Sequence, residues 1–297
     1  MIPNSLKRMV PAPVLRRGAA ARDSAKKAWA RARFNRSALH PEWLDPNLLP
    51  KLQAKYKFPP EYGYERDQLA ARGRERAEQI LRETLPGTSP NAFLELGSGD
   101  AMVSCALQTL GKRATAVDMD GNKFDPRAVQ AGVVVKHMDA AHLEFADACF
   151  DFVFSYNAFE HFADPGAVLR EAARVLKEGG LLYLYFGPLG MSPLGLHAYR
   201  IITVPYCQFL FPAGTISDFA KKSNVAEEIP YINGWPADAY RKLWRADHGL
   251  ETLRYREETH EYGLELVAKY PSCFRSKTDN FENLLVSSME ALFRKGR

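Results

Sequence analysis

The chain has 297 residues, of which 46% are hydrophobic and 25% are charged, and its formal net charge is +5. This balance excludes a disordered chain and suits one sizeable domain with additions. The four cysteines form no close pairs, so the sequence predicts neither a metal site nor a disulfide framework, and it fits a reducing compartment such as the cytoplasm. They are Cys105, Cys149, Cys207 and Cys273.

The first 40 residues form a basic arm. They hold ten Lys and Arg residues against the single acid Asp23, so ten minus one gives +9 there and leaves −4 for the remainder. Three interpretations stay open: an organellar transit peptide, a helix that contacts an anionic membrane surface, and a solvated basic helix. Nucleic acid binding is disfavoured because no aromatic or helix-turn-helix pattern accompanies the charge.

Residues 41–90 are predicted to form a connector followed by a helix. Five prolines between Leu39 and Pro60 indicate irregular structure. From about residue 64 to residue 85, apolar residues recur between charged ones, which is typical of a surface helix that ends at Pro86 and Gly87.

Residues 91–186 alternate between strand and helix patterns. Such alternation predicts an α/β fold with a doubly wound, mostly parallel sheet. The carboxyl ends of strands one, two and four would share one edge, where sheets of this kind bind ligands. We expect strands at 92–96, 114–118, 133–137, 150–155 and 181–186, and helices near 101–111, 124–131 and 166–177, the last closed by Gly179 and Gly180.

A glycine-rich turn, Gly97-Ser98-Gly99, directly follows the first expected strand. Glycines in such a turn let the backbone approach a ligand closely. The dinucleotide fingerprint requires a third glycine where this chain has Met102, so pyrophosphate binding is disfavoured. Glu95, just before the turn, suits a ligand with positive charge, and Asp118 ends the second strand, where a ribose diol is usually held.

Together these motifs resemble the successive cofactor motifs of class I S-adenosylmethionine-dependent methyltransferases, in the small-molecule branch often called type 11. The resemblance covers residues 91–186 and implies a Rossmann-like, seven-stranded sheet whose last strand is antiparallel and inserts between strands five and six. The chain departs from the family at Ala101, where a third glycine is common. The matching segments are 95–99, 117–118, 137–140, 150–157, 160–162 and 169–182.

The resemblance implies S-adenosylmethionine as the cofactor and assigns residues to it. The acid before the turn faces the methionine portion, and the turn lines its path. The acid after the second strand takes both ribose hydroxyls, a later acid receives the adenine amino group, and an asparagine lies near the sulfonium. In that order the implied residues are Glu95; Gly97, Ser98 and Gly99; Asp118 with Met119; Asp139 with Ala140; and Asn157.

Residues 187–236 are apolar and aromatic but interrupted by Pro, Gly, His and Arg, so no run reaches the eighteen or more residues of a membrane span. We expect a cap over the cofactor edge, inserted after strand five; the alternative is additional core. Residues 237–297 would complete the sheet core, with a helix at 237–247 and strands at 250–256 and 284–295. Six aromatic residues of the cap favour an acceptor with an apolar or ring-bearing body: Tyr199, Tyr206, Phe209, Phe211, Tyr231 and Trp235.

The sequence therefore predicts methyl transfer to a small-molecule acceptor, with a hydroxyl favoured. A histidine suits removal of the hydroxyl proton near neutral pH. His161 is preferred over His197 because the sheet fixes its position. One alternative is a nicotinamide-dependent oxidoreductase, disfavoured by Met102 and by the lack of any Tyr-x-x-x-Lys pair. The other is a non-catalytic partner subunit of the same fold.

Overall fold

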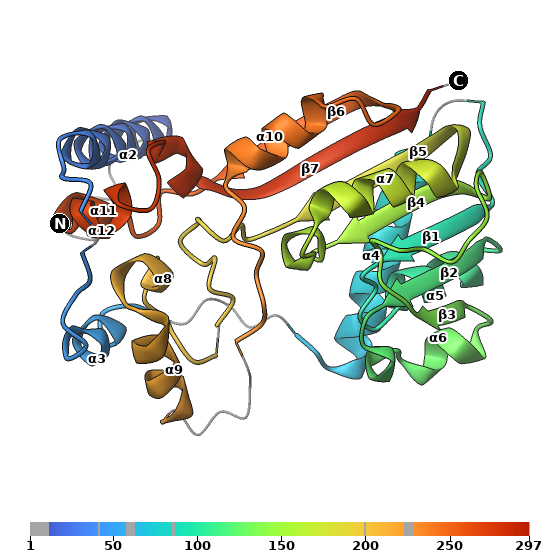
Figure 1. Ribbon diagram of the computed structural model, residues 1–297, viewed down its shortest axis with the longest axis horizontal. Helices are drawn as coiled ribbons and strands as arrows, with labels where there is room; N and C mark the ends of the chain where they lie inside the picture. The colour runs from blue at the N-terminus through green and yellow to red at the C-terminus, as the bar shows by residue number, and fades with distance from the viewer. Residues whose placement is uncertain are drawn as a thin grey trace.

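The computed structural model describes residues 12–40, 42–57, 63–84, 87–198, 200–222 and 229–296, and for residues 12–23 it describes the backbone alone. The described chain forms two parts (Figure 1). We call the sheet and the helices on its faces the sheet core. We call the helical lobe the part built from residues 24–57, 196–222 and 264–285, which lies at the other end of the molecule.

The sheet has seven strands in the order β3-β2-β1-β4-β5-β7-β6. Strands β1 to β5 pair in parallel, whereas β7 is antiparallel to both of its neighbours. The predicted doubly wound sheet and the inserted last strand are confirmed. The strands are β1 Ala92–Leu96, β2 Arg113–Asp118, β3 Val134–His137, β4 Phe150–Tyr156, β5 Leu176–Phe186, β6 Leu250–Thr259 and β7 Val286–Lys295.

Helices cover both faces of the sheet, which is why its central strands are apolar at almost every position. Successive residues of a strand point to opposite faces. Accordingly Phe93 packs in the cluster with α4 and α5, whereas Leu94 packs in the cluster with α7 and α10. These helices are α4 Arg66–Arg82, α5 Met102–Thr109, α6 Pro126–Gln130, α7 Pro165–Val175 and α10 Ala237–Arg245, with short 3-10 turns η1 Gly121–Lys123 and η2 Phe159–His161.

The end of α7 differs from the prediction. The helix stops at Val175, and Gly179 and Gly180 lie inside β5 rather than closing the helix. Leu176 already pairs with Phe150, and the register shifts before the next pair. A Cβ on Gly180 would lie 2.8 Å from a backbone oxygen, so the glycines serve an irregularity of the strand.

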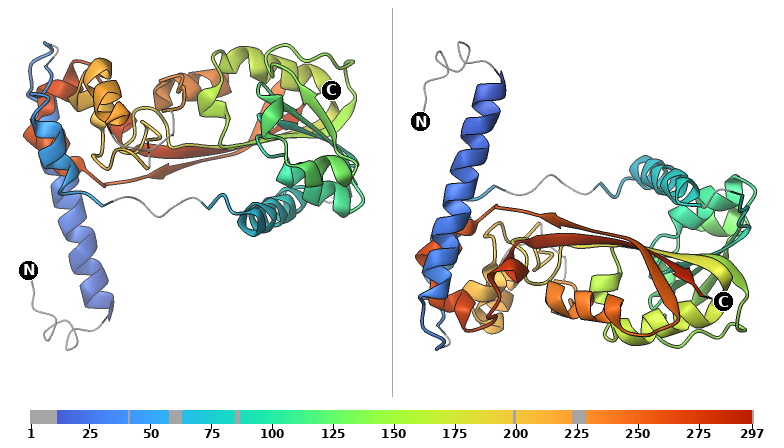
Figure 2. Two further views of the ribbon diagram at one scale, coloured as in Figure 1. Left: turned by 90° about the horizontal axis from the view of Figure 1, so that it is seen from below. Right: turned by 90° about the horizontal axis from the view of Figure 1, so that it is seen from above.

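Three segments that are far apart in the sequence build the helical lobe. Ala30 and Phe34 of the predicted basic arm are fully buried in its core. Residues 264–285, predicted to belong to the sheet core, leave it between β6 and β7 and join the lobe (Figure 2). The lobe helices are α2 Ala12–Asn35, α3 Leu48–Gln53, α8 Cys207–Leu210, α9 Ala213–Lys221, α11 Leu264–Lys269 and α12 Pro271–Arg275, with η3 Phe281–Leu284.

The aromatic residues of the predicted cap divide between core and surface. Tyr206, Phe209 and Phe211 are buried in the lobe core, so the prediction that they line an acceptor site is wrong. Trp235 packs against the sheet core, Tyr231 is exposed, and Tyr199 lies outside the described residues. Among the residues described, none of the helices is long and apolar enough to cross a membrane.

Candidate functional site

The glycine turn after β1 adopts a left-handed backbone, with φ of +64° at Gly97 and +53° at Gly99. Glycine accepts this conformation without steric cost. The space around the two residues differs, however. A Cβ on Gly97 would lie 2.5 Å from the Ala158 Cβ, whereas a Cβ on Gly99 would meet nothing within 4 Å. Gly97 therefore lets the turn pack on the segment after β4, and Gly99 faces open space.

Ala101 has a φ of +57° at the residue before α5 and is fully buried. A side chain raises the energy of this left-handed conformation, which glycine adopts freely. The turn therefore keeps the left-handed backbone that glycine favours, although this chain has an alanine where the family commonly has a glycine.

Glu95 points beneath the turn, into the start of α5. Its carboxylate accepts hydrogen bonds from the Ser104 backbone N–H at 3.1 Å and the Ser104 hydroxyl at 2.6 Å. Burial raises the pKa of Glu95 to about 8, against the lowering effect of the Ser104 bonds. The acid thus supports the turn from inside the protein.

Asp118 ties the end of β2 to the glycine turn. Its carboxylate accepts from the backbone N–H of Gly99 at 2.8 Å and of Asp120 at 2.9 Å. Parallel pairing of β1 with β2 brings these residues together. The acid and the open side of the turn thus share one edge of the sheet, as the alternation of strands and helices predicts.

The remaining residues implied by the family resemblance follow the ends of β2, β3 and β4. Met119 is 62% exposed, an unusual position for an apolar side chain. Asp139 accepts from the Ala141 N–H at 2.8 Å, and Ala140 beside it is buried. Asn157 has a φ of +49° and donates its backbone N–H to the Tyr185 carbonyl at 2.8 Å. All of these residues therefore lie on the loops at the carboxyl edge of the sheet.

One polar atom in the turn lacks a protein partner. The Ser98 hydroxyl oxygen is buried and makes no hydrogen bond with the residues described. Buried polar groups are rarely left without a partner, because each costs free energy. We call the glycine turn, Gly97–Gly99, together with Asp118 the cradle. A buried hydroxyl without a partner, next to the open space at Gly99, fits a cradle that a polar ligand completes.

His161 and His197, the two candidate bases, lie side by side. Their ring centroids are 5.0 Å apart, and the rings are perpendicular at 89°. His161 ends η2 after β4, and His197 comes from the loop between β5 and α8. Burial lowers the pKa of both imidazoles, that of His197 to about 4. Both rings are therefore neutral near pH 7.

Each histidine is oriented by a backbone carbonyl. His161 Nδ1 lies 2.6 Å from the Tyr231 oxygen, and His197 Nε2 lies 2.6 Å from the Pro188 oxygen. A carbonyl oxygen can only accept a hydrogen bond, so these nitrogens carry the ring protons. The lone pairs consequently reside on Nε2 of His161 and on Nδ1 of His197.

Glu160 lies beside the histidines and is only 1% exposed. Its Oε1 accepts from the Gly187 N–H at 3.0 Å, and its Oε2 is buried without a hydrogen-bond partner in the described chain. Burial raises the pKa of this carboxyl to about 8. Glu160 lies in a segment that matches the family, but the resemblance gives it no role. The sequence therefore did not predict Glu160 as a functional residue.

Asn233 holds the turn that carries these groups. Its backbone N–H donates to the Glu160 carbonyl at 3.0 Å, and its side-chain amide donates to the carbonyls of Phe159 and Phe162 at 3.3 and 3.0 Å. The segment around Asn233 thus holds η2 in place through three hydrogen bonds to backbone carbonyls of η2 and the residue after it. Nothing in the sequence pattern indicates this contact, because the two segments are more than seventy residues apart.

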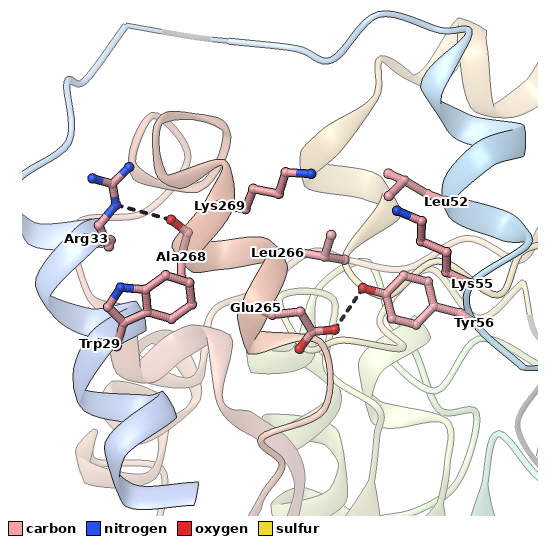
Figure 3. A pocket seen from close by; sticks show the side chains of 9 residues that line it. All are labelled: Trp29, Arg33, Leu52, Lys55, Tyr56, Glu265, Leu266, Ala268 and Lys269. Carbon is pink, nitrogen blue, oxygen red and sulfur yellow. Dashed lines mark hydrogen bonds between the residues drawn. The ribbon is translucent and has the colours of Figure 1, made fainter. Parts of the chain in front are cut away.

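A hollow of about 740 Å³ lies in the helical lobe (Figure 3). Its walls come from α2, α3 with the residues after it, and α11. Three cations, Arg33, Lys55 and Lys269, lie around it against one acid, Glu265, beside the half-exposed Trp29. Arg33 donates to the Ala268 carbonyl at 3.3 Å. This basic hollow is remote from the glycine turn.

Comparison with known proteins gives a consistent set of relatives. A family described as methyltransferase domain matches residues 94–184. The ubiquinone biosynthesis O-methyltransferase of Parvibaculum lavamentivorans is 30% identical over 191 residues, covering 62% of this chain and 70% of that protein. The protein of the same name from Nitrosomonas europaea is 24% identical over 201 residues, covering 62% and 76%. The 27-O-demethylrifamycin SV methyltransferase of Amycolatopsis mediterranei is 32% identical over 149 residues, covering 46% and 54%.

Proposed function

The chain belongs to the class I S-adenosylmethionine-dependent methyltransferases, and from this premise we propose that it methylates a hydroxyl oxygen of a small, ring-bearing or apolar acceptor. The observation that carries the hydroxyl assignment is the pair of adjacent histidine rings beside the buried Glu160 carboxyl group, in the segment that packs against the glycine turn. The names of three relatives, which place the methyl group on oxygen, support it. The oxidoreductase and non-catalytic alternatives are set aside, because the relatives are methyltransferases.

The residues of the sheet edge fit the cofactor. Asp118 would accept from the ribose hydroxyls, and the orphaned Ser98 hydroxyl would gain a partner. The open space beside Gly99 leaves room for the cofactor to lie against the protein backbone. The exposed side chain of Met119 and the Asp139–Ala140 segment would hold the adenine, while Asn157 lies on the β4 side of the same edge. Glu95 acts from beneath, by holding the start of α5.

The bound cofactor supplies a methyl group on a positively charged sulfur, which keeps the electron pair of the carbon–sulfur bond when the acceptor oxygen attacks. The protein has two tasks in such a transfer: to align the partners and to remove the hydroxyl proton. The turn at Ala158 contacts the glycine turn and so fixes the distance between the cradle and η2. His161 and His197 then activate the hydroxyl from the acceptor side.

The surroundings of the histidines favour a ring-bearing acceptor. The Phe162 ring would lie 3.1 Å from a Cβ on Gly97, so it forms a wall between the cradle and η2. The Tyr231 side chain is 63% exposed, and its carbonyl holds His161. Aromatic surfaces of this kind bind apolar rings, with a few polar groups to fix orientation. Phenols and hydroxylated polycyclic compounds are therefore the first acceptors to test.

The decisive experiment uses the full-length protein with methyl-labelled S-adenosylmethionine and a panel of phenols, hydroxyquinones and polyketides. Mass spectrometry should find a product heavier by one labelled methyl group, attached to oxygen. The variant Asp118→Ala, which is expected to bind the cofactor poorly, is the control for background chemistry. A product labelled on nitrogen or sulfur, while the hydroxyl compounds stay unmodified, would contradict the proposal.

The helical lobe supports a second, non-catalytic proposal: peripheral contact with an anionic membrane surface. Arg33, Lys55 and Lys269 surround the hollow of Figure 3, beside the half-exposed Trp29. Basic residues near an anionic leaflet each contribute about 1 kcal/mol to binding. Tryptophan favours the interface because one end is apolar and the other polar. The proposal concerns where the enzyme meets an apolar acceptor and not how it methylates.

A further inference from the structure

Glu160, His161 and His197 form a cluster with the composition of a metal site. Each offers one ligand atom, and the three atoms lie within 4.8 Å of one another. Two imidazoles and one carboxylate suit first-row transition metals such as zinc and iron. We propose that these three residues bind a divalent transition cation, which takes the acceptor's hydroxyl oxygen as a further ligand. The role of the cation rests on the proposed function, but its binding does not.

Each histidine ring makes a hydrogen bond of the kind that supports histidine ligands in metal sites. In metal sites a ligating histidine nearly always donates its other ring N–H to a carbonyl or carboxylate, which fixes the ring and its tautomer. Here the Tyr231 and Pro188 carbonyls do this, each at 2.6 Å. The supporting bonds that a metal site needs are therefore already built, one for each histidine.

The carboxylate supplies an independent observation. Glu160 Oε1 accepts from the Gly187 N–H and lies 4.0 Å from His161 Nε2, while Oε2 is buried and has no hydrogen-bond partner among the described residues. An ionised carboxylate in the interior is costly unless a positive charge or several donors compensate it. A cation bound by this carboxylate would give this compensation. The Asn233 contacts, which fasten η2, would keep the carboxylate in place without competing for it.

The backbone at His197 is also unusual. Its φ of +54° lies in the left-handed region, which is uncommon outside glycine. Strained backbone of this kind is retained where the surrounding structure over-determines it, and often at functional sites. The neighbours Leu196 and Ala198 pack against the lobe core, so the helical lobe presents His197 to the sheet core.

Three protein ligands leave coordination positions open for other oxygens. A hydroxyl bound there loses its proton more easily, as metal-bound water does. The proton would leave to solvent, the oxygen lone pair would form the bond to the methyl carbon, and the cation would keep its charge. A nitrogen that binds a cation cannot accept a proton, so the histidines would act as ligands in place of the predicted base. The side chain of His161 is 31% exposed, which leaves the cluster accessible from one side.

Cobalt(II) provides a direct test, because its visible absorption reports the number and type of ligands. The full-length protein, freed of metals with a chelator, should bind one equivalent without the charge-transfer absorption of thiolate ligands. His197→Ala should weaken binding at least about 100-fold, since even outer-shell partners of metal sites contribute 10–100-fold. His260→Ala, an exposed histidine outside the cluster, should leave binding unchanged. Circular dichroism checks that each variant is folded.

Glu160→Gln is the second variant, because its amide oxygen can still accept from Gly187. It too should weaken cobalt binding while the protein stays folded. The proposal is overturned if the wild type binds no stoichiometric cobalt, if thiolate absorption shows that cysteines bind it, or if both variants bind as tightly as the wild type. Binding is measured without cofactor or acceptor, so a failure to find methyl transfer to oxygen would leave this result unaffected.

Discussion

The sheet core and the helical lobe differ in how the chain builds them. Residues 92–186 form the first five strands and the intervening helices in chain order, and each ligand-facing loop directly follows a strand. The lobe instead joins three segments, near residues 30–52, 198–216 and 264–285, into one buried cluster. Local sequence therefore determines the first region, whereas long-range packing determines the second.

The candidate site lies where the two regions meet. His161 comes from the loop after β4, and His197 comes from the loop that the lobe core holds through Leu196 and Ala198. The cradle belongs to the sheet core, because Asp118 bonds to the N–H groups of Gly99 and Asp120 and Gly97 packs against Ala158 in the loop after β4. Cofactor binding and acceptor activation should consequently respond differently to damage in the lobe.

The largest effect is expected from Phe34→Ala in the lobe core. Phe34 is fully buried and packs against the Phe281 ring at 5.6 Å. Removal of a buried phenylalanine side chain typically costs about 3–5 kcal/mol. Urea unfolding should show this loss, while calorimetric titration should find S-adenosylmethionine affinity within about twofold of the wild type under native conditions, because the cradle lies outside the lobe.

Trp29→Ala is the matched control, since Trp29 is an aromatic residue of the same helix but 52% exposed. Its effect on stability should be small, as for most surface substitutions. If Phe34→Ala abolished cofactor binding in a folded protein, the two regions would not be independent.

The next effect separates the two glycines of the turn. Gly97→Ala places a Cβ 2.5 Å from Ala158 in a left-handed conformation, so overpacking and backbone strain should together cost about 2–5 kcal/mol. Gly99→Ala meets no protein atom within 4 Å, so its loss of stability should be limited to the strain, while cofactor affinity falls. Unfolding and titration measurements on both variants test the distinction.

Gly111→Ala is the control for Gly99→Ala. Gly111 also has positive φ, +78°, and an open Cβ direction, but it lies between α5 and β2, away from the cradle. The strain should be similar and the cofactor affinity normal. Equal affinities for the Gly99 and Gly111 variants would show that the ligand does not pass beside the turn.

Asp118→Ala tests whether the ribose is held by the sheet core. Each hydrogen bond to a charged group contributes about 1.5–3 kcal/mol, so affinity for S-adenosylmethionine should fall at least tenfold. Asp120→Ala removes a neighbouring acid that caps η1 through the Asn122 N–H, and it should leave the affinity nearly unchanged. Titration calorimetry on both folded variants compares them. Normal binding by Asp118→Ala would remove this residue from the site.

The sheet core was predictable because its signals are local. Alternating apolar residues, the glycine turn and Asp118 each belong to one strand or its following loop. Right-handed crossovers make the parallel sheet doubly wound, and the place of the last strand is implied by the family resemblance. The end of α7 was mispredicted because pairing of Leu176 with Phe150 is a tertiary contact. The sequence predicts that the site lies at the carboxyl edge of the sheet. It could not predict the different environments of Gly97 and Gly99, because these depend on contact with Ala158.

The helical lobe and the histidine pair show the limit of sequence patterns. Tyr206, Phe209 and Phe211 have the composition of a ligand-binding surface, but their packing partners lie in residues 264–285, far along the chain. His161 and His197 were predicted as alternatives, and only the fold shows that they are neighbours. The unpartnered Glu160 oxygen likewise becomes visible only in three dimensions.

A further effect should appear in the pH dependence of stability. The pKa of Glu95 is raised by burial from its ordinary value of 4.5 to about 8. The folded protein therefore binds this proton more tightly than the unfolded chain, so its stabilising contribution is complete below pH 4.5 and is lost as pH rises towards 8. Within this window the wild type should lose up to about 1.4 kcal/mol per pH unit relative to Glu95→Gln, which cannot ionise. Urea unfolding of both proteins at several pH values measures the difference; parallel curves would mean that Glu95 is ionised throughout.

The smallest effect is expected at the basic hollow of the lobe. If Arg33, Lys55 and Lys269 meet an anionic surface, the protein should bind vesicles of mixed phosphatidylcholine and phosphatidylglycerol, and added salt should weaken the binding. Each of Lys55→Gln and Lys269→Gln should reduce the partition coefficient roughly fivefold, since a basic residue near such a surface contributes about 1 kcal/mol. Lys242→Gln removes an exposed lysine of α10 in the sheet core and should change binding little. Sedimentation with sucrose-loaded vesicles compares the four proteins. Equal losses for all three variants would show that net charge alone drives binding, and the distinction between the two regions would then not extend to the membrane surface.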